Sequence, residues 1–84
     1  MRRRQIASEI RTVARDWAAN AEDEDDPSMV RMYRSDAEDL RKVAQLVDEG
    51  DIQGARDAAS LDTQVREQLP QSFFDLLERC EVAW

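Results

Sequence analysis

The chain has few of the side chains that enzymes use for acid–base or nucleophilic chemistry. Histidine is absent, which removes the commonest general base and every Ser-His or Cys-His arrangement. The one cysteine, Cys80, falls on the same predicted helix face as Leu76 and Leu77, and we expect it to be a buried, inert thiol. Gly50 and Gly54 lie in the stretch D-E-G-D-I-Q-G-A-R, which lacks the lysine of a phosphate-binding loop. The sequence therefore predicts a protein that is not an enzyme and that uses no cofactor.

The densest group of carboxylates in the sequence is Glu22, Asp23, Glu24, Asp25 and Asp26. A calcium loop that began at Asp23 would need glycine at its sixth position and glutamate at its twelfth, where this chain has Ser28 and Arg34. There is also no histidine and no second thiol, so we expect no metal site. Three interpretations of the run stay open: a solvated linker, a docking site for a basic partner, or a weak cation site.

A second charged group is Arg2-Arg3-Arg4, which shares a predicted helix with Arg11 and Arg15. Arginines can contact phosphate, but the net charge of −7 repels nucleic acid and anionic membranes, and no DNA-reading motif is present. We therefore expect no direct nucleic-acid or membrane binding. The arginines are expected to pair with acids elsewhere, with Arg11 or Arg15 meeting Asp36 or Asp39.

The spacing of apolar residues predicts an all-α fold. Ile6, Ile10, Val13 and Trp17 recur at steps of four and three, which indicates a helix over residues 3–20. A longer stripe indicates a helix over residues 27–49, with Asp26 as its cap, Pro27 at its first position and Gly50 at its end. The stripe consists of Val30, Tyr33, Ala37, Leu40, Ala44 and Val47. These two helices are expected to form a long antiparallel hairpin.

Two or three short C-terminal helices are expected to pack across one end of this hairpin. Their predicted ranges are 52–60 after an Asp51 cap, 63–69 after an Asp62 cap, and 72–82 after Pro70. In the last of these, Ser72 and Asp75 fit a capping box. The expected architecture is a small helical bundle that forms a single domain over residues 1–84.

The stretch from Leu46 to Arg56 resembles the turn of a tetratricopeptide-type helical hairpin, in which Gly-Asp follows a helix and an alanine comes soon after. The resemblance covers about a dozen residues, and no period of about 34 residues accompanies it. We interpret it as a glycine C-cap followed by an aspartate N-cap, which implies a turn between two helices.

Four aromatic positions remain to be assigned. Trp17 and Tyr33 lie on the apolar stripes and are expected in the core. Phe73 and Phe74 are adjacent, so one helix face cannot bury both equally, and Trp84 ends the sequence. Phe74 and Trp84 are therefore either anchors for a partner or a second copy of the chain, or side chains that fold back onto a thin core.

These observations favour a non-enzymatic protein whose acidic surface binds a basic site on a larger protein. The chain resembles, in its small size, acidity and arginine bias, phage and mobile-element inhibitors such as anti-CRISPR proteins, which implies mimicry of nucleic acid in a positively charged groove. The alternative is a helical structural or regulatory module that homodimerises or binds an amphipathic partner helix. No secretory signal follows the N-terminal arginines, so we expect a cytoplasmic location in a bacterial or host cell. The residues expected at the partner surface are Glu22, Asp23, Glu24, Asp25, Asp26, Asp36, Glu38, Asp39, Asp48, Glu49, Asp51, Phe74 and Trp84.

Overall fold

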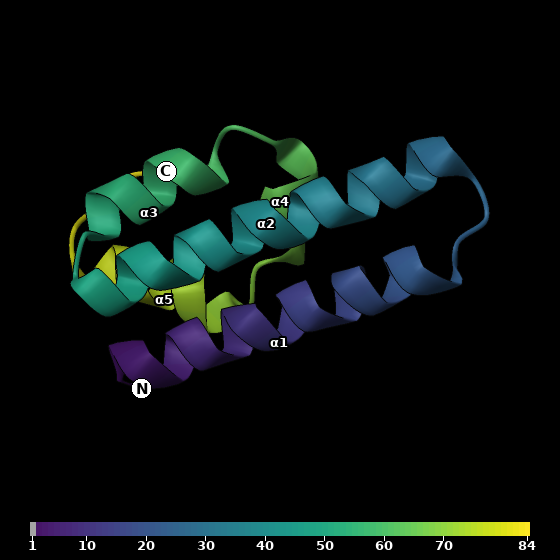
Figure 1. The fold of residues 1–84 in the computed structure, drawn as a ribbon. Helices are drawn as coiled ribbons and strands as arrows, with labels where there is room; N and C mark the ends of the chain where they lie inside the picture. The colour runs from purple at the N-terminus through teal and green to yellow at the C-terminus, as the bar shows by residue number, and fades with distance from the viewer. Residues whose placement is uncertain (1) are drawn as a thin grey trace.

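The computed structural model describes residues 2–84, and within that range the chain forms helices and no strands. The five helices are α1 (Arg3–Asp23), α2 (Pro27–Glu49), α3 (Ile52–Ala59), α4 (Thr63–Gln68) and α5 (Gln71–Arg79). Helices α1 and α2 run antiparallel, side by side, and the three short helices lie against one end of this pair (Figure 1). The predicted all-α fold, with a long hairpin and short C-terminal helices, is confirmed.

The ends of α2 follow from local chemistry. Asp26 Oδ1 accepts the Ser28 N–H at 2.9 Å, and Pro27 occupies the first turn, where a missing N–H is harmless. Gly50 ends the helix with φ +83°, a left-handed conformation that favours glycine. Helix α1 continues three residues past its predicted end at Asn20, because Ala21 is buried against the pair and holds the last turn in place.

The short helices begin largely as expected. Asp51 accepts the Gly54 N–H at 2.9 Å, and Asp62 accepts the Gln64 N–H at 2.8 Å. The capping box at Ser72 was wrong, because α5 begins one residue earlier and Pro70, at its N-cap, supplies no side-chain hydrogen bond. Ser72 Oγ instead donates a hydrogen bond to Glu9 Oε2 at 2.6 Å, which ties α5 to α1.

The core lies at the end of the hairpin that the short helices cover. It takes apolar side chains from all five helices, and their burial removes enough surface from water to hold helices of only six to nine residues in place. The fully buried members with large side chains are Ile6, Ile10, Leu40, Val43, Val47, Val65 and Phe73. At the other end the hairpin extends beyond the short helices and is only two helices thick (Figure 1).

At that exposed end Trp17 of α1 and Tyr33 of α2 contact each other, with ring centroids 5.1 Å apart. Both were expected in the core, but each is only half-buried, and Trp17 packs against the core from its edge. Their contact joins α1 to α2 at the edge of the core.

Cys80 differs from its prediction as well. It was expected to be a buried thiol on the face of Leu76 and Leu77, but it is exposed. Helix α5 ends at Arg79 rather than at the predicted residue 82. The Cys80 N–H still bonds to the Leu76 carbonyl at 3.0 Å, but Cys80 lies at the C-terminal end of the helix, where its side chain is left exposed.

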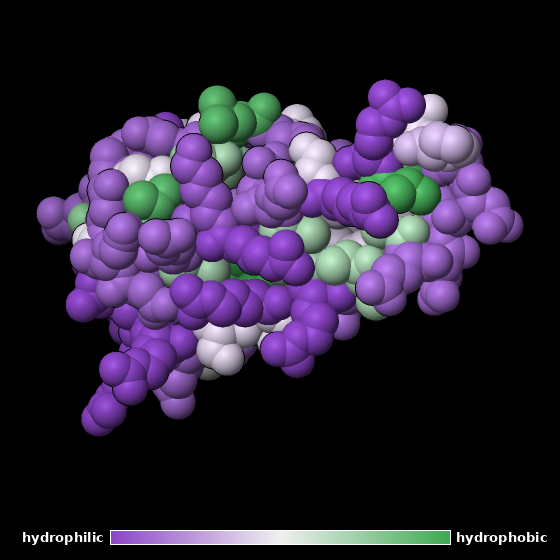
Figure 2. Space-filling model, viewed as in Figure 1, coloured by the Kyte–Doolittle hydropathy of each residue, from purple (hydrophilic) through white to green (hydrophobic). Residues whose placement is uncertain are grey.

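No helix in the described part of the chain is long and apolar enough to cross a membrane. The surface in the view of Figure 2 is mostly hydrophilic, and its apolar residues appear as separate patches.

Candidate functional site

The five carboxylates of residues 22–26 lie at the turn between α1 and α2, and we call this group the acidic tip. All are exposed except Glu24, which is half-buried. Glu24 Oε1 accepts the N–H groups of Asp25 and Asp26, each at 3.1 Å, and Asp26 caps α2. Two of the five carboxylates thus hold the turn in one conformation, so it is more than a loose charged linker.

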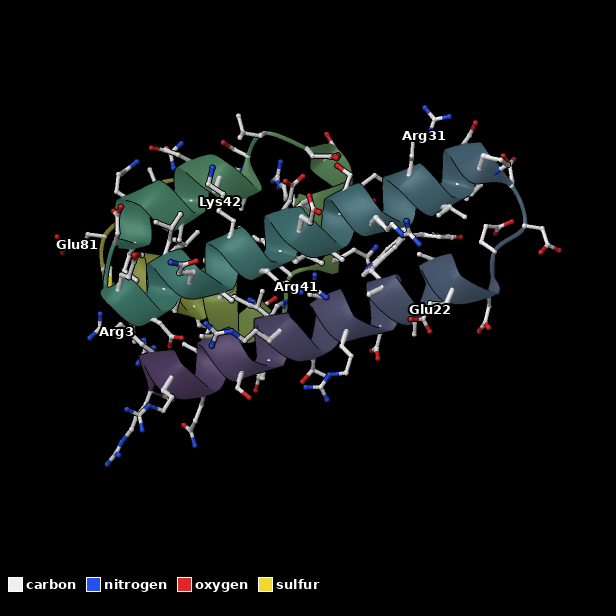
Figure 3. All side chains as sticks on the ribbon, viewed as in Figure 1. Arg3, Glu22, Arg31, Arg41, Lys42 and Glu81 are labelled. Atoms are coloured by element: carbon white, nitrogen blue, oxygen red, sulfur yellow. The ribbon has the colours of Figure 1, made fainter. Side chains whose placement is uncertain are left out.

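The other three carboxylates of the tip, those of Glu22, Asp23 and Asp25, form no ion pair or side-chain hydrogen bond with the described residues. Glu22 borders a shallow depression together with Arg34, Glu38 and other residues of the hairpin. Its side chain lies near the turn in Figure 3. The tip therefore presents three carboxylates without an ion pair at one extreme of the molecule, and Arg34 and Arg41 border the same depression as Glu22.

The carboxylates at the other end of α2 have different surroundings. Asp48 pairs with Arg11 at 2.7 Å, and Asp51 is committed to capping α3, whereas Glu49 is exposed. Helix α2 has 23 residues, so about 34 Å separates these groups from the acidic tip. The predicted acidic residues therefore do not form one continuous surface.

Arginines line the hairpin from the start of α1, at the end away from the acidic tip, to the middle of both long helices. Arg2, Arg3, Arg4 and Arg11 line an open hollow with Asp48, and an adjoining hollow is lined by Arg11, Arg15, Arg41 and Gln45. We call these six arginines the arginine face. Arg3 and Arg41 mark it in Figure 3.

The expected pairing of these arginines with acids occurs only in part. Arg11 pairs with Asp48, and Arg56 pairs with Asp57. The predicted pairing of Arg11 or Arg15 with Asp36 or Asp39 was wrong, because these two aspartates face the start of α4 instead. The guanidinium of Arg3 lies against Gly50 at the C-terminal end of α2, where a cation is favourable.

A third group, the aspartate cluster, consists of Asp36 and Asp39 of α2 and Asp62 at the N-cap of α4. One carboxylate oxygen of each lies within 4.8 Å of the others. Asp36 is only 1% exposed, and its Oδ2 is buried without a hydrogen-bond partner. Asp39 and Asp62 are half-buried at the edge of the same cluster.

The surroundings of the aspartate cluster favour its neutral forms. Burial, the negative charge of Asp62, a hydrogen bond that protonated Asp36 can donate to Asp62, and the charge of Asp39 together raise the pKa of Asp36 to about 6. The pKa of Asp39 is raised as well, chiefly by burial and then by the charges of Asp62 and Glu38. Nearby Lys42 opposes this shift.

The structure therefore removes Asp36 from the predicted partner surface, because a carboxylate that is 1% exposed cannot contact a docked protein. Its position in the sequence contains the signal: Asp36 precedes Leu40 by four residues and Val43 by seven, which places it on the apolar stripe. Asp62 was predicted only as a helix cap. Its proximity to α2 depends on how α3 and its turn return the chain, which no local pattern specifies.

The aromatic residues near the C-terminal end contact one another. The ring of Phe74 lies 5.8 Å from that of Phe73 and 5.6 Å from that of Trp84, and the guanidinium of Arg66 lies 4.6 Å above the Trp84 ring. Both predicted anchors thus fold back onto the bundle, although Trp84 stays 38% exposed. The sequence analysis missed Leu61, which is 82% exposed in the α3–α4 connection.

The chain was compared with family models, curated proteins and solved structures, and no match was found in any of the three comparisons. Its function must accordingly be argued from the acidic tip, the arginine face and the aspartate cluster.

Proposed function

We propose that this chain is a non-enzymatic binding protein that inserts its acidic tip into a basic site of a larger protein. The observation that carries the proposal is that Glu22, Asp23 and Asp25 are fixed at the hairpin turn without an ion pair of their own. Carboxylates that no internal cation neutralises attract a positively charged surface over about 8–10 Å at ordinary ionic strength.

A groove that normally holds nucleic-acid phosphates is the kind of basic site that suits this tip. Phosphate-binding grooves are lined with arginine and lysine, and rigid carboxylates can occupy them in place of phosphates. The proposed role is therefore that of an inhibitor by nucleic-acid mimicry, of the phage or mobile-element type that anti-CRISPR proteins represent, acting in the cytoplasm of a bacterial or host cell.

The arginine face supports one orientation of this encounter. A basic partner repels Arg2, Arg3, Arg4 and the neighbouring arginines, and it attracts the acidic tip at the opposite end. The long axis of the molecule, 42 Å against 21 and 19 Å for the others, separates the two charges. The chain is thus expected to approach a basic partner with its tip first.

The test replaces the three unpaired carboxylates of the tip and leaves Glu24 and Asp26, which hold the turn, unchanged. We expect the triple variant Glu22→Gln, Asp23→Asn, Asp25→Asn to bind the partner captured from the source cell at least about tenfold more weakly than the native chain at low salt. Binding of the native chain should weaken as NaCl rises, and binding of the variant should depend less on salt. Isothermal titration calorimetry at several salt concentrations measures both effects.

A matched control carries the same change in net charge elsewhere. Asp16, Glu67 and Glu78 are exposed and form no contact that holds the fold, so Asp16→Asn, Glu67→Gln, Glu78→Gln serves this purpose. The control should bind nearly as the native chain does. If both triple variants lose the same affinity, net charge governs binding and the tip has no special role.

A second candidate function is a module that pairs with its own copy or with an amphipathic helix. The observation that favours it is the exposure of Leu61, at 82%, and of Trp84, at 38%. Association through these side chains should hardly change with salt, and Leu61→Ser should abolish it, whereas the triple variant of the tip should leave it intact. Sedimentation equilibrium distinguishes the two functions.

A further inference from the structure

The aspartate cluster plays no part in the proposed binding through the acidic tip. It lies in the middle of α2, where α4 packs behind that helix (Figure 1), and its most important member is shielded from any docking protein. The cluster would bring three negative charges within one small volume if all its members were ionised. Such a cluster is unfavourable in a fold unless a positive group is bound there.

The described residues supply little positive charge to the cluster. Neither the Arg11–Asp48 ion pair nor the Arg56–Asp57 ion pair includes a residue of the cluster. Lys42 influences Asp39 but makes no ion pair with it. Asp36 is nearly fully buried, its Oδ2 has no hydrogen-bond donor, and one of its carboxylate oxygens lies within 4.8 Å of oxygens of its two neighbours.

We propose that Asp36, Asp39 and Asp62 bind one divalent cation, and that Ca²⁺ fits better than Mg²⁺. The donor set consists of carboxylate oxygens alone, without histidine or thiolate, which selects hard cations over zinc or copper. Asp39 and Asp62 are half-buried, so the outer side of the ion can keep water molecules as further ligands.

The preference for Ca²⁺ follows from how the two ions are coordinated. Ca²⁺ takes six to eight oxygen ligands at about 2.3–2.6 Å in a flexible geometry. Three carboxylate oxygens that lie within 4.8 Å of one another can all reach one such ion without an ideal arrangement. Mg²⁺ requires near-ideal octahedral geometry and loses its water reluctantly.

A bound cation would join the middle of α2 to the first turn of α4. Asp62 already caps α4 through one oxygen, which accepts the Gln64 N–H at 2.8 Å, and its other oxygen is available to the ion. The ion would therefore stabilise the placement of α4, a helix of only six residues, without changing the acidic tip.

The experiment measures the thermal unfolding midpoint and the heat of binding of CaCl₂ and MgCl₂ on the full chain, first freed of metal with a chelator. With Ca²⁺ at about 5 mM, above the roughly 10⁻⁴–10⁻³ M dissociation constants of low-affinity calcium modules, we expect the midpoint to rise by about 5 °C. Mg²⁺ at the same concentration should raise it less. Calorimetry should give one Ca²⁺ per chain.

Two variants of the cluster and one control make the result specific. Asp36→Asn and Asp39→Asn should each weaken Ca²⁺ binding at least about tenfold, while Asp25→Asn, which removes the same charge from the acidic tip, should bind Ca²⁺ as the native chain does. Equal midpoint shifts in the native chain and Asp36→Asn would overturn the site, and a larger shift with Mg²⁺ would overturn the choice of calcium. Because the cluster and the tip are changed by different variants, failure of one proposal leaves the other untouched.

Discussion

Asp36 occupies a position that helical periodicity assigns to an apolar residue. It shares the buried stripe of α2 with Leu40 and Val43, yet its carboxyl group lies 1% exposed beside Asp39 and Asp62. Burial of a carboxyl group favours its neutral form, as does the charge of a neighbouring carboxylate. The negative charge of Asp36 can thus be removed by protonation or balanced by a bound cation.

The raised pKa of Asp36 predicts how stability depends on pH in metal-free buffer. The folded chain holds this proton up to about pH 6, whereas the unfolded chain releases it near 3.8. The folded state therefore binds more protons between these values, and the stability that this proton provides is full below pH 3.8 and lost as pH rises through 6. We expect the free energy of unfolding to fall across this window by up to about 3 kcal/mol on account of Asp36.

Denaturant unfolding of the native chain and of Asp36→Asn at several pH values checks this prediction. Asn cannot ionise, so the variant should lack most of this decline and be the more stable protein at pH 7. The pKa of Asp39 is raised as well, by burial and by the charges of Asp62 and Glu38, so Asp39 contributes a decline of the same sign that the variant retains. Parallel curves for the two proteins would mean that Asp36 ionises in the folded chain as freely as in the unfolded one.

Cys80 gives a second prediction for a single residue. Because its thiol is exposed beyond the end of α5, we expect it to react with a thiol reagent such as Ellman's reagent in the native protein nearly as fast as in denaturant. Stopped-flow absorbance measures the two rates. A native rate that is orders of magnitude below the denatured rate would show that the thiol is buried, as helical periodicity predicts.

At the scale of elements, the junction between α2 and α3 depends on two adjacent caps. Gly50 takes the left-handed conformation that lets α2 end, and Asp51 begins α3 at once. This junction is the stretch that resembles a tetratricopeptide-type turn, and it forms the helix–turn–helix connection that the resemblance implies. The guanidinium of Arg3 packs on the bare face of Gly50 and fastens the start of α1 to it.

Gly50→Ala should therefore destabilise the fold by about 1–2 kcal/mol, because alanine resists positive φ and its methyl group would displace Arg3. Thermal or denaturant unfolding measures the loss. The double variant Arg3→Ala, Gly50→Ala removes the collision but not the backbone strain, and Gly50→Asn tolerates the backbone but keeps the collision. An Ala variant as stable as the native chain would mean that α2 can end without a left-handed residue.

At the scale of the whole molecule, the core lies at one end and the hairpin extends past it. The short helices cover the end of the hairpin that holds Ile6, Ile10 and Val47, and the hairpin extends beyond them toward its turn (Figure 1). Trp17 and Tyr33 join α1 to α2 at the edge of the core. The acidic tip thus stands on the thinnest part of the fold, where repulsion between its carboxylates has the least packing to oppose it.

This uneven distribution predicts graded hydrogen exchange. Backbone amides of residues 40–47, which lie under the short helices, should exchange only by global unfolding, and those of residues 18–32 should exchange faster by opening of the hairpin end. Native-state exchange read by NMR distinguishes the two classes. Uniform protection along α2 would show that the hairpin opens as one unit with the core.

Local signals in the sequence determined most of the architecture. The three-and-four spacing of apolar residues, Asp26 with Pro27, and the pair Gly50-Asp51 specify helices and their ends, because these interactions join residues close together in the chain. Two local predictions failed at α5. Its capping box did not form, since Ser72 bonds to Glu9 instead, and Cys80, at the C-terminal end of the helix, is exposed. In both cases the outcome depended on which other parts of the chain lie near α5, and the local pattern does not encode that.

The tertiary structure alone decided how the charged groups are distributed. The sequence identified the acidic tip as a continuous run, but it did not place Asp62 beside Asp36, Arg11 beside Asp48, or six arginines on one face. Such groupings depend on the register of α1 against α2 and on the path of the chain through α3 into α4. Register and path are set by the packing of the whole core, so residues far apart in the sequence meet for reasons that no short segment contains.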